Sequence, residues 1–329
     1  MRRTIAAQHD RFALHTPFRI SRGVKTAADV VTVTIRQGDA IGRGEGVPYA
    51  RYGESVEGVL AQVAGVRGAV EDGADAQALL SLLPPGAARN AVDCALWDLE
   101  ARLTGRSVAD VIGAPVSASI VSALTIAIDS PEAMARTAAA VAHAPLLKVK
   151  VDALDPAAQV RAVRGAAPDA VLIVDPNESW DEAVATAMRN VLIETRVALL
   201  EQPAASDADA WLKGFDAGAP VCADESIHVA GDLDALAGRY GVVNIKLDKA
   251  GGLTAALELA YAARARGFGL MTGCMVSSSL SIAPALHVAA MSDFVDLDGP
   301  LWLSEDRTGG VHDRRGMLEP PAPGFWGEA

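Results

Sequence analysis

Two lysines stand one residue apart in the apolar stretch PLLKVKVD, at positions 148 and 150. A stretch this apolar is expected to form a buried strand, and lysine is among the residues least often buried. Side chains alternate along a strand, so Lys148 and Lys150 point to the same side. Neighbouring ammonium groups disfavour each other's charge, which lowers a pKa. The pair therefore predicts a lysine that can act as a base near neutral pH.

Three carboxylates occupy matching places in the apolar runs that follow. Asp175, Glu201 and Asp224 each lie near the end of such a run, spaced by about one strand–helix unit. Adjacent strands lie about 4.8 Å apart, so the three carboxylates can converge on one point. Three desolvated anions need a cation, and an all-oxygen set suits Mg²⁺ better than Zn²⁺, which prefers His and Cys. The sequence thus predicts a Mg²⁺ site.

Lys246 ends a further apolar run, four runs after the one that carries Lys150. In a ring of eight strands this places the two lysines on opposite sides, with the predicted metal site between them. Such a pair is suited to removing a proton from one face of a carbon atom and returning one to the other face. A carbon next to a carboxylate is a very weak acid, so the metal is needed to stabilise the negative charge that develops. A class I aldolase would explain one lysine but not three carboxylates.

These side chains need a scaffold, and eight short apolar runs between residues 120 and 300 provide it. Stretches with helical periodicity, such as LTAALELAYAARARG, separate the runs. Alternating strands and helices of this number predict a (β/α)8-type barrel. Active sites of such barrels lie at the C-terminal ends of the strands, where the charged residues named above fall.

The first part of the chain follows another pattern. VVTVTIRQGDAIGRGEGVPY indicates an antiparallel hairpin, and ARNAVDCALWDLEARLTG indicates a helix. We therefore predict an α+β capping domain over 1–115, a barrel with the catalytic site over 116–300, and a C-terminal segment, 301–329, that packs back on the capping domain. GRGEG lacks the GxGxxG spacing of a dinucleotide site and is interpreted as a hairpin turn. Asp93 and Asp98 are interpreted as a solvated or capping face of their helix.

Composition excludes several classes of partner. The 329 residues carry a net charge of −12, which argues against nucleic acid and against anionic membranes. No apolar run approaches the length of a membrane span, and no signal peptide is visible. The three cysteines are far apart and indicate neither a metal site nor a disulfide framework, which favours the cytoplasm. The oligomeric state is left open, a homo-oligomer included.

The motifs KVK, VDPNESW, EQP, ADES and NIKLDKAGG resemble those of the enolase superfamily, in its muconate-lactonising-enzyme-like subgroup. LHTPFRISRG, PYARYGES and DLDGPLWL are similar to those of dipeptide epimerases, which act on substrates such as L-Ala-D/L-Glu from cell-wall peptide turnover. The resemblance spans nearly the whole chain. It implies the following roles: Asp175, Glu201 and Asp224 as Mg²⁺ ligands, Lys150 and Lys246 as the two acid/bases, and Lys148 as the residue that tunes Lys150 and helps hold the substrate carboxylate.

Asp296 and Asp298 bear on the substrate class. Both can project into the barrel mouth from one strand, and two uncompensated carboxylates require a cation from the substrate. In dipeptide epimerases a similar Asp-x-Asp binds the free α-ammonium group of the dipeptide. A solvated loop is the alternative interpretation. N-acylamino-acid racemisation, o-succinylbenzoate synthesis and cycloisomerisation on the same scaffold would not need this pair. A barrel that only binds a ligand would have lost a base or a metal ligand, and none is missing.

Supporting residues are assigned around this centre. Arg22, in a loop over residues 20–26 that closes over the mouth, is predicted to pair with a glutamate side chain of the substrate, with Arg19 and Lys25 as competitors. Asn177 and Asp248 are predicted to support the site from behind. For Asn177 the alternative is capping of the helix that begins near residue 180.

Overall fold

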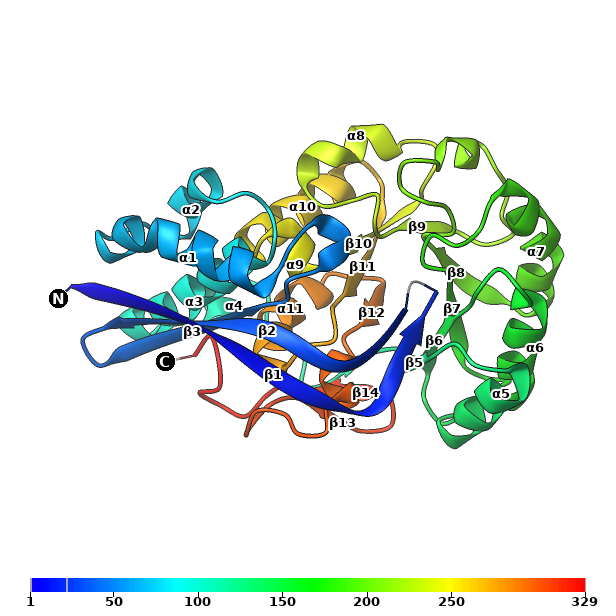
Figure 1. The fold of residues 1–329 in the computed structure, drawn as a ribbon, viewed down its shortest axis with the longest axis horizontal. Helices are drawn as coiled ribbons and strands as arrows, with labels where there is room; N and C mark the ends of the chain where they lie inside the picture. Colours follow the sequence, from blue (N-terminus) through cyan, green and yellow to red (C-terminus); the bar gives the residue numbers. More distant parts are fainter. Residues whose placement is uncertain (1, 22, 329) are drawn as a thin grey trace.

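The N-terminal part of the chain is built on a long antiparallel sheet of three strands. The computed structural model describes residues 2–21 and 23–328. Strands β1 (Arg3–Ile20) and β2 (Gly23–Gln37) form a hairpin, and β3 (Ala40–Gly46) pairs with β2. The closed end of this hairpin extends far from the N-terminus and reaches over the barrel toward β6 and β7 (Figure 1).

The segment predicted as a loop around Arg22 is this closed end of the hairpin. The two strands stay paired up to Ile20 and Gly23. The Ser21 hydroxyl donates a hydrogen bond to the carbonyl oxygen of Asn177 at 3.0 Å, so the hairpin is anchored to a barrel loop. Arg22 itself lies outside the described residues, and its pairing with a substrate carboxylate stays a prediction.

The GRGEG motif forms β3, so its interpretation as a turn is wrong. The turn of this hairpin lies at residues 38–39. The glycines are needed because helix α3 (Ala87–Thr104) crosses β3 at very short range. A Cβ atom on Gly42, Gly44 or Gly46 would come within 2.2 Å of a backbone carbonyl oxygen of α3.

Four helices cover the inner face of the three-stranded sheet. The helices are α1 (Val56–Glu71), α2 (Ala76–Leu82), α3 and α4 (Val108–Ile112). A short 3-10 turn, η1 (Ala50–Tyr52), precedes them. Ser55, Asp75 and Ser107 cap α1, α2 and α4 by accepting a backbone hydrogen bond in the first turn. Valines of α1 at helical spacing pack against Val33 and Ile35 of β2 in one apolar cluster.

Asp93 and Asp98 of α3 are buried, so their interpretation as a solvated face is wrong. Asp93 accepts hydrogen bonds from the hydroxyl of Thr254 at 2.6 Å and from its backbone N–H at 3.1 Å. Asp98 accepts hydrogen bonds from the backbone N–H groups of Arg43 and Gly327. Both carboxylates therefore join α3 to parts of the chain that are distant in sequence, which helical periodicity alone does not reveal.

Eight parallel strands form the predicted barrel, and the fold class is confirmed. The sheet order is β12-β11-β10-β9-β8-β7-β6-β5. The two outermost strands meet where the backbone N–H of Ala123 donates to the carbonyl oxygen of Val295 at 2.8 Å. The strands are β5 (Leu124–Ile126), β6 (Leu146–Lys150), β7 (Val171–Asp175), β8 (Val197–Glu201), β9 (Val221–Ala223), β10 (Val242–Ile245), β11 (Gly269–Gly273) and β12 (Phe294–Asp296).

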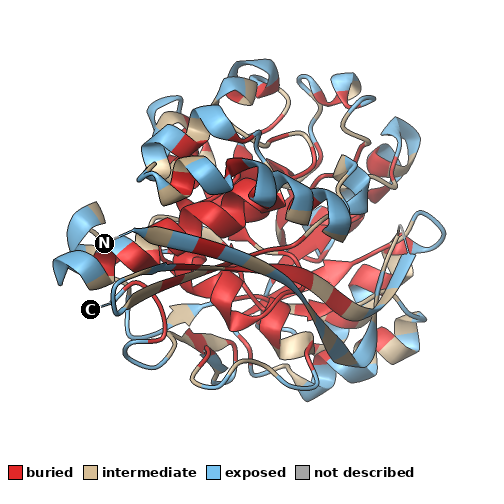
Figure 2. Ribbon diagram, turned by 60° about the vertical axis from the view of Figure 1, so that its left-hand side comes forward, coloured by how far each residue is buried: buried red, intermediate tan, exposed pale blue. Residues whose placement is uncertain are grey.

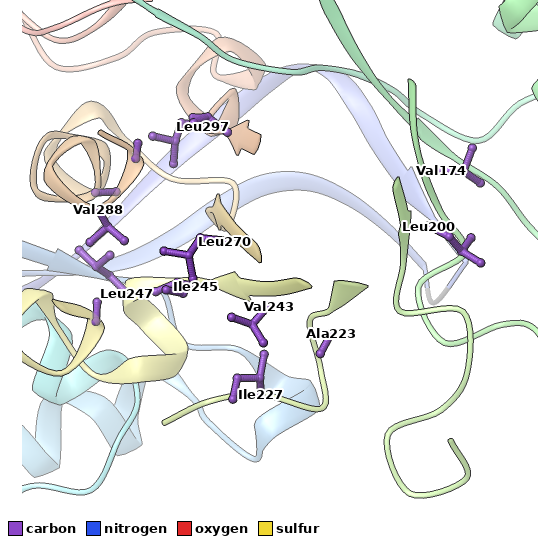
Figure 3. Packing of buried hydrophobic residues seen from close by; sticks show 14 of the residues in the cluster. Val174, Leu200, Ala223, Ile227, Val243, Ile245, Leu247, Leu270, Val288 and Leu297 are labelled. Atoms are coloured by element: carbon purple, nitrogen blue, oxygen red, sulfur yellow. The ribbon is translucent and has the colours of Figure 1, made fainter. Parts of the chain in front are cut away.

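The barrel interior begins with an apolar layer to which every strand, or the residue beside it, contributes one side chain. These are Ala123, Leu146, Ile173, Leu199, Cys222, Val242, Met271 and the partly buried Phe294. The next residue along a strand points outward, as Val174, Leu200 and Ala223 do, and joins the apolar shell between barrel and helices (Figure 3). Because side chains alternate, the residue two positions after each inner apolar residue must again face the interior.

Helices surround the barrel, and most of its strands lie in the buried centre of the molecule (Figure 2). The helices are α5 (Pro131–Ala140), α6 (Pro156–Ala166), α7 (Glu182–Glu194), α8 (Leu233–Leu236), α9 (Leu247–Ala250), α10 (Leu253–Ala265) and α11 (Ser279–Ala289). Not every connection is a full helix: β8 is followed by the short turn η2 (Ala210–Leu212), and β9 by η3 (Ala230–Asp232) and the four-residue α8. None of the helices in the described part of the chain is long and apolar enough to cross a bilayer.

The C-terminal residues run along both parts of the molecule. After η4 (Gly299–Trp302), β13 (His312–Asp313) and β14 (Met317–Glu319) form a small sheet with β4 (Ile120–Val121). The Trp326 indole N–H then donates to the carbonyl oxygens of Arg43 and Cys94. The division of the chain at residues 115 and 300 stays a prediction.

Arg307 joins the three-stranded sheet to the barrel through an ion pair with the buried Glu45. Its Nη2 lies 2.8 Å from Glu45 Oε2 and 3.0 Å from Asp10 Oδ2, and its Nε lies 2.7 Å from the Ser278 hydroxyl oxygen. Glu45 is fully buried, so removing its cation leaves an uncompensated charge. We expect Arg307→Met to lower the free energy of unfolding in urea titrations by about 3 kcal/mol.

The exposed pair of Arg314 and Glu319 supplies the control for that measurement. Because Arg314 is largely exposed, Arg314→Met should change the free energy of unfolding by less than about 1 kcal/mol. An equal decrease in the free energy of unfolding in the two variants would contradict the role of Arg307 as the partner of the buried Glu45.

Candidate active site

Alternation along the strands brings the charged residues into the barrel mouth. Two positions above the apolar layer lie Thr125, Lys148, Asp175, Glu201, Asp224, Asn244, Gly273 and Asp296, one from each strand or the residue next to it. Two positions further on, Lys150, Lys246 and Asp298 face the same cavity. The same rule that builds the core therefore builds the site.

Lys148 lies at the centre of this charged cluster. Its Nζ is 2.7 Å from Glu201 Oε2, 2.8 Å from Asp296 Oδ2 and 3.1 Å from Asp175 Oδ2. Burial lowers the pKa of Lys148, but the three carboxylates outweigh burial and raise this pKa well above its usual range. The three carboxylates, and not the neighbouring Lys150, therefore decide the direction in which the pKa of Lys148 is shifted.

Asp175 is held by two lysines and by its own loop. Lys150 Nζ lies 2.5 Å from Asp175 Oδ2. Asn177 donates its backbone N–H to Oδ1 at 2.9 Å and its side-chain amide to Oδ2 at 3.2 Å. Burial raises the pKa of Asp175, but Lys150 and Lys148 lower it to about 2. The following helix is capped by Asp181, so the capping alternative for Asn177 is wrong.

Asp224 lies two strands away from Asp175 in the barrel and has its own pair of lysines. Lys246 Nζ lies 2.7 Å from Oδ2, and Lys249 Nζ lies 2.6 Å from Oδ1. Burial raises the pKa of Asp224, but the two ammonium groups lower it well below its usual range. Burial also lowers the pKa of Lys246, and Asp224 raises it well above the usual range.

Glu201 completes the set of three buried carboxylates. Its Oε1 accepts a hydrogen bond from the Asn244 amide at 2.8 Å, whereas Oε2 accepts none and faces the Lys148 ammonium group. Burial and the negative charge of Asp175 raise the pKa of Glu201 to about 7. The carboxylate is therefore short of positive charge despite the neighbouring lysine.

The donor chemistry of these three carboxylates fits a hard divalent cation. Asp175, Glu201 and Asp224 offer only oxygen, from three neighbouring strands, and Glu201 keeps an oxygen without a hydrogen bond. Mg²⁺ prefers such ligands, with water or substrate completing its shell. Within residues 2–21 and 23–328, no three His, Cys, Asp or Glu side chains are arranged around a single metal position, and lysine ammonium groups lie against the three carboxylates.

Asp296 and Asp298 face the same cavity from the last strand. Asp296 is 5% exposed, and its Oδ1 accepts no hydrogen bond. Asp298 Oδ2 accepts a hydrogen bond from the backbone N–H of Thr125 at 2.8 Å. Burial and the charge of Asp296 raise the pKa of Asp298 to about 6. The pair thus forms a buried anionic wall that lacks a full complement of positive charge.

A cavity of about 700 Å³ connects these groups with the hairpin above them. Phe18, Ile20, Val24 and Lys25 of the hairpin line one side, and the segment after β3 contributes residues 47–52. The barrel side is lined by charged residues: Lys148, Lys150, Asp224, Glu225, Lys246, Asp296 and Asp298. The cavity therefore lies between the hairpin, with residues 47–52 beside it, and a charged barrel floor.

Comparison with known proteins decides the family. Residues 2–113 match the mandelate racemase/muconate lactonizing enzyme N-terminal domain, and residues 132–325 match the family described as enolase C-terminal domain-like. The chain belongs to the enolase superfamily. The predicted resemblance is confirmed.

Relatives of this enolase-superfamily chain include several epimerases and a racemase. An L-Ala-D/L-Glu epimerase from Escherichia coli is 47% identical over 92% of this chain and 95% of the relative. An N-acetyl-D-glutamate racemase from Pseudoalteromonas is 41% identical over 91% of this chain and 96% of the relative.

Solved structures give the same picture. An enolase family member from Agrobacterium tumefaciens with homology to dipeptide epimerases, with bound sodium and L-Ala-L-Glu, superposes with a TM-score of 0.96 at 46% identity, covering 99% of this chain and all of that one. A dipeptide epimerase from Enterococcus faecalis, complexed with Mg and L-Leu-L-Tyr, gives a TM-score of 0.91 at 27% identity and covers both chains fully.

Asp248 and Lys249 lie behind this enolase-superfamily site and are not among the described residues that line its cavity. Asp248 turns away from the mouth and accepts hydrogen bonds at 2.8 Å from the backbone N–H of Val47 and from the Asn90 amide. Lys249, which follows it, is fully buried against Asp224. Lys249 was not among the predicted site residues, although its position one helical turn after Lys246 was a usable signal.

Proposed function

We propose that this chain is a Mg²⁺-dependent dipeptide epimerase that inverts the α-carbon of the C-terminal residue of a dipeptide such as L-Ala-D/L-Glu. The observation that carries the proposal is the placement of Lys150 and Lys246. They lie on β6 and β10, four strands apart in a ring of eight, with three buried carboxylates on the strands between them. The relatives named as epimerases support the same reaction.

Asp175, Glu201 and Asp224 would hold the cation. When bound, Mg²⁺ supplies positive charge to the substrate's carboxylate oxygens as the α-proton leaves, which makes a weak carbon acid reactive. The Mg-bound structure of a related dipeptide epimerase supports this assignment.

The two lysines would divide the proton transfer between the faces of the substrate. One Nζ takes the α-proton from one face, and the other Nζ, as an ammonium group, returns a proton to the opposite face. Lys148, fixed by three carboxylates, cannot move as freely and is proposed to orient the substrate carboxylate. The hairpin and residues 47–52 would exclude water from the reacting carbon.

Asp296 and Asp298 would bind the free α-ammonium group of the dipeptide. Asp296 Oδ1 accepts no hydrogen bond although the residue is buried, so an ammonium donor would satisfy it. An acylated amino acid has no such group. This observation favours a dipeptide over the second candidate substrate, an N-acylamino acid. That second candidate is supported by the relative named N-acetyl-D-glutamate racemase.

We further propose that the chain acts in the cytoplasm on peptides released by cell-wall turnover. All three cysteines are free thiols, and two of them are buried, as suits a reducing compartment.

Proton NMR in D₂O tests the proposed reaction directly. We expect L-Ala-D-Glu and L-Ala-L-Glu to lose the α-proton signal of the C-terminal residue while the other diastereomer appears. Adding EDTA should stop both changes, and adding Mg²⁺ should restore them. N-acetyl-D-glutamate serves as the comparison substrate. Exchange of that compound without exchange of any dipeptide would replace the proposed function by the second candidate.

A further inference from the structure

Lys249 is a buried cation whose hydrogen bonds are all accounted for within the protein. Its side chain is 1% exposed. The ammonium group donates to the backbone carbonyl oxygen of Asp224, to Asp224 Oδ1 at 2.6 Å and to the carbonyl oxygen of Asn244 at 3.1 Å. An ammonium group has three hydrogens, so no donor remains for a substrate.

Asp224 is fixed from several sides by these contacts. Its backbone N–H donates to Gln202 Oε1 at 2.8 Å, while Lys249 holds its carbonyl oxygen and Oδ1. The remaining oxygen, Oδ2, lies 2.7 Å from Lys246 Nζ. Both Asp224 and Lys246 line the cavity, whereas Lys249 is not among its lining residues in the described part of the chain.

We propose that Lys249 is a positioning residue, which fixes Asp224 with Oδ2 toward Lys246, and that it transfers no proton itself. This inference rests on the proposed function. Lys249 gives Asp224 a positively charged partner on the side away from the cavity. It also ties the end of β9 to β10 through Asn244, so the carboxylate and Lys246 keep a fixed relative position.

The proposal makes a prediction about metal affinity that a spare acid/base would not make. Partners behind a metal ligand typically contribute about 10- to 100-fold to affinity. Lys249→Met removes all three donors but keeps a flexible, unbranched side chain of similar size. Mg²⁺ titration of the metal-free protein by calorimetry should give a dissociation constant about 10- to 100-fold higher than in the wild type. Lys249→Arg, which keeps the charge, should recover part of the affinity.

Exchange of each stereoisomer in D₂O separates positioning from proton transfer. A lost acid/base abolishes exchange of one isomer of L-Ala-D/L-Glu and spares the other. A misplaced metal ligand slows both isomers by the same factor, because both need the same cation. We expect equal slowing in Lys249→Met, relieved in part by excess Mg²⁺. Loss of exchange for one isomer only, or an unchanged Mg²⁺ affinity, would overturn the proposal.

Controls keep these outcomes interpretable. Lys213→Met alters an exposed lysine and should leave affinity and exchange unchanged. If Lys249→Met does not fold, as judged by thermal unfolding, Lys249→Gln retains two donors and takes its place. The titration needs no dipeptide, so it tests Lys249 even if the wild type exchanges none and the proposed reaction is wrong. A wild type that binds no Mg²⁺ would overturn the role assigned to Lys249 and the metal site together.

Discussion

Replacing Lys150 or Lys246 by alanine should reduce epimerisation of L-Ala-D/L-Glu by about 10³-fold or more, because each removes the acid/base on one face of the α-carbon. Each variant should still exchange the α-proton of one isomer with D₂O, through the lysine that remains. The two variants should retain opposite isomers, since β6 and β10 face each other across the barrel. Proton NMR of both diastereomers, before and after incubation, measures all four rates.

The matched control is again Lys213→Ala, which removes an exposed lysine. Retention of the same isomer by both variants would place the two lysines on one face and would contradict the proposed division of labour. Full epimerisation by either variant would remove that lysine from the mechanism. Mg²⁺ titrations of the variants should accompany the kinetics, because Lys150 and Lys246 also pair with Asp175 and Asp224.

The fold and most of the residues of the site could be predicted from the sequence, because both depend on the periodicity of apolar residues along the strands and helices. Because side chains alternate along a strand, the residue two positions beyond each inner apolar residue also faces the barrel interior. That rule leads from Ile173 to Asp175, from Leu199 to Glu201 and from the apolar run of β6 to its two lysines. The rule needs only the register of each strand, which the apolar pattern supplies.

What the sequence did not reveal are contacts between elements that are far apart along the chain. Lys148 and Lys150 were expected to disfavour each other's charge. Three carboxylates from other strands surround Lys148 instead and raise its pKa. The sequence pattern places Asp93 on the solvated face of its helix, whereas in the structure Thr254 lies against it. The periodicity of one helix or strand does not indicate which residues of another element lie against it.

Asp298→Asn should change which substrates are accepted more than it changes the fold. The asparagine Oδ1 can still accept the hydrogen bond from the Thr125 N–H, so the substitution removes charge and little else. A buried partner of a charged group contributes about 2 to 5 kcal/mol, so kcat/KM for L-Ala-D-Glu should fall by about 10²-fold or more. The kcat/KM for N-acetyl-D-glutamate should not fall with it, because that compound has no ammonium group for Asp298 to bind.

The pH dependence gives this prediction a second, independent readout. Burial and Asp296 raise the pKa of Asp298 to about 6, so the carboxylate loses its charge as the pH falls through that value. Binding of a substrate ammonium group then weakens, and kcat/KM for the dipeptide should decline below about pH 6. Asp298→Asn should lack the contribution of Asp298 to this acid limb and keep that of Glu201, whose pKa is raised to about 7, whereas Asp293→Asn, just before β12, should keep the whole limb. An acid limb unchanged by Asp298→Asn, together with unchanged selectivity, would mean that the dipeptide's amino group is bound elsewhere.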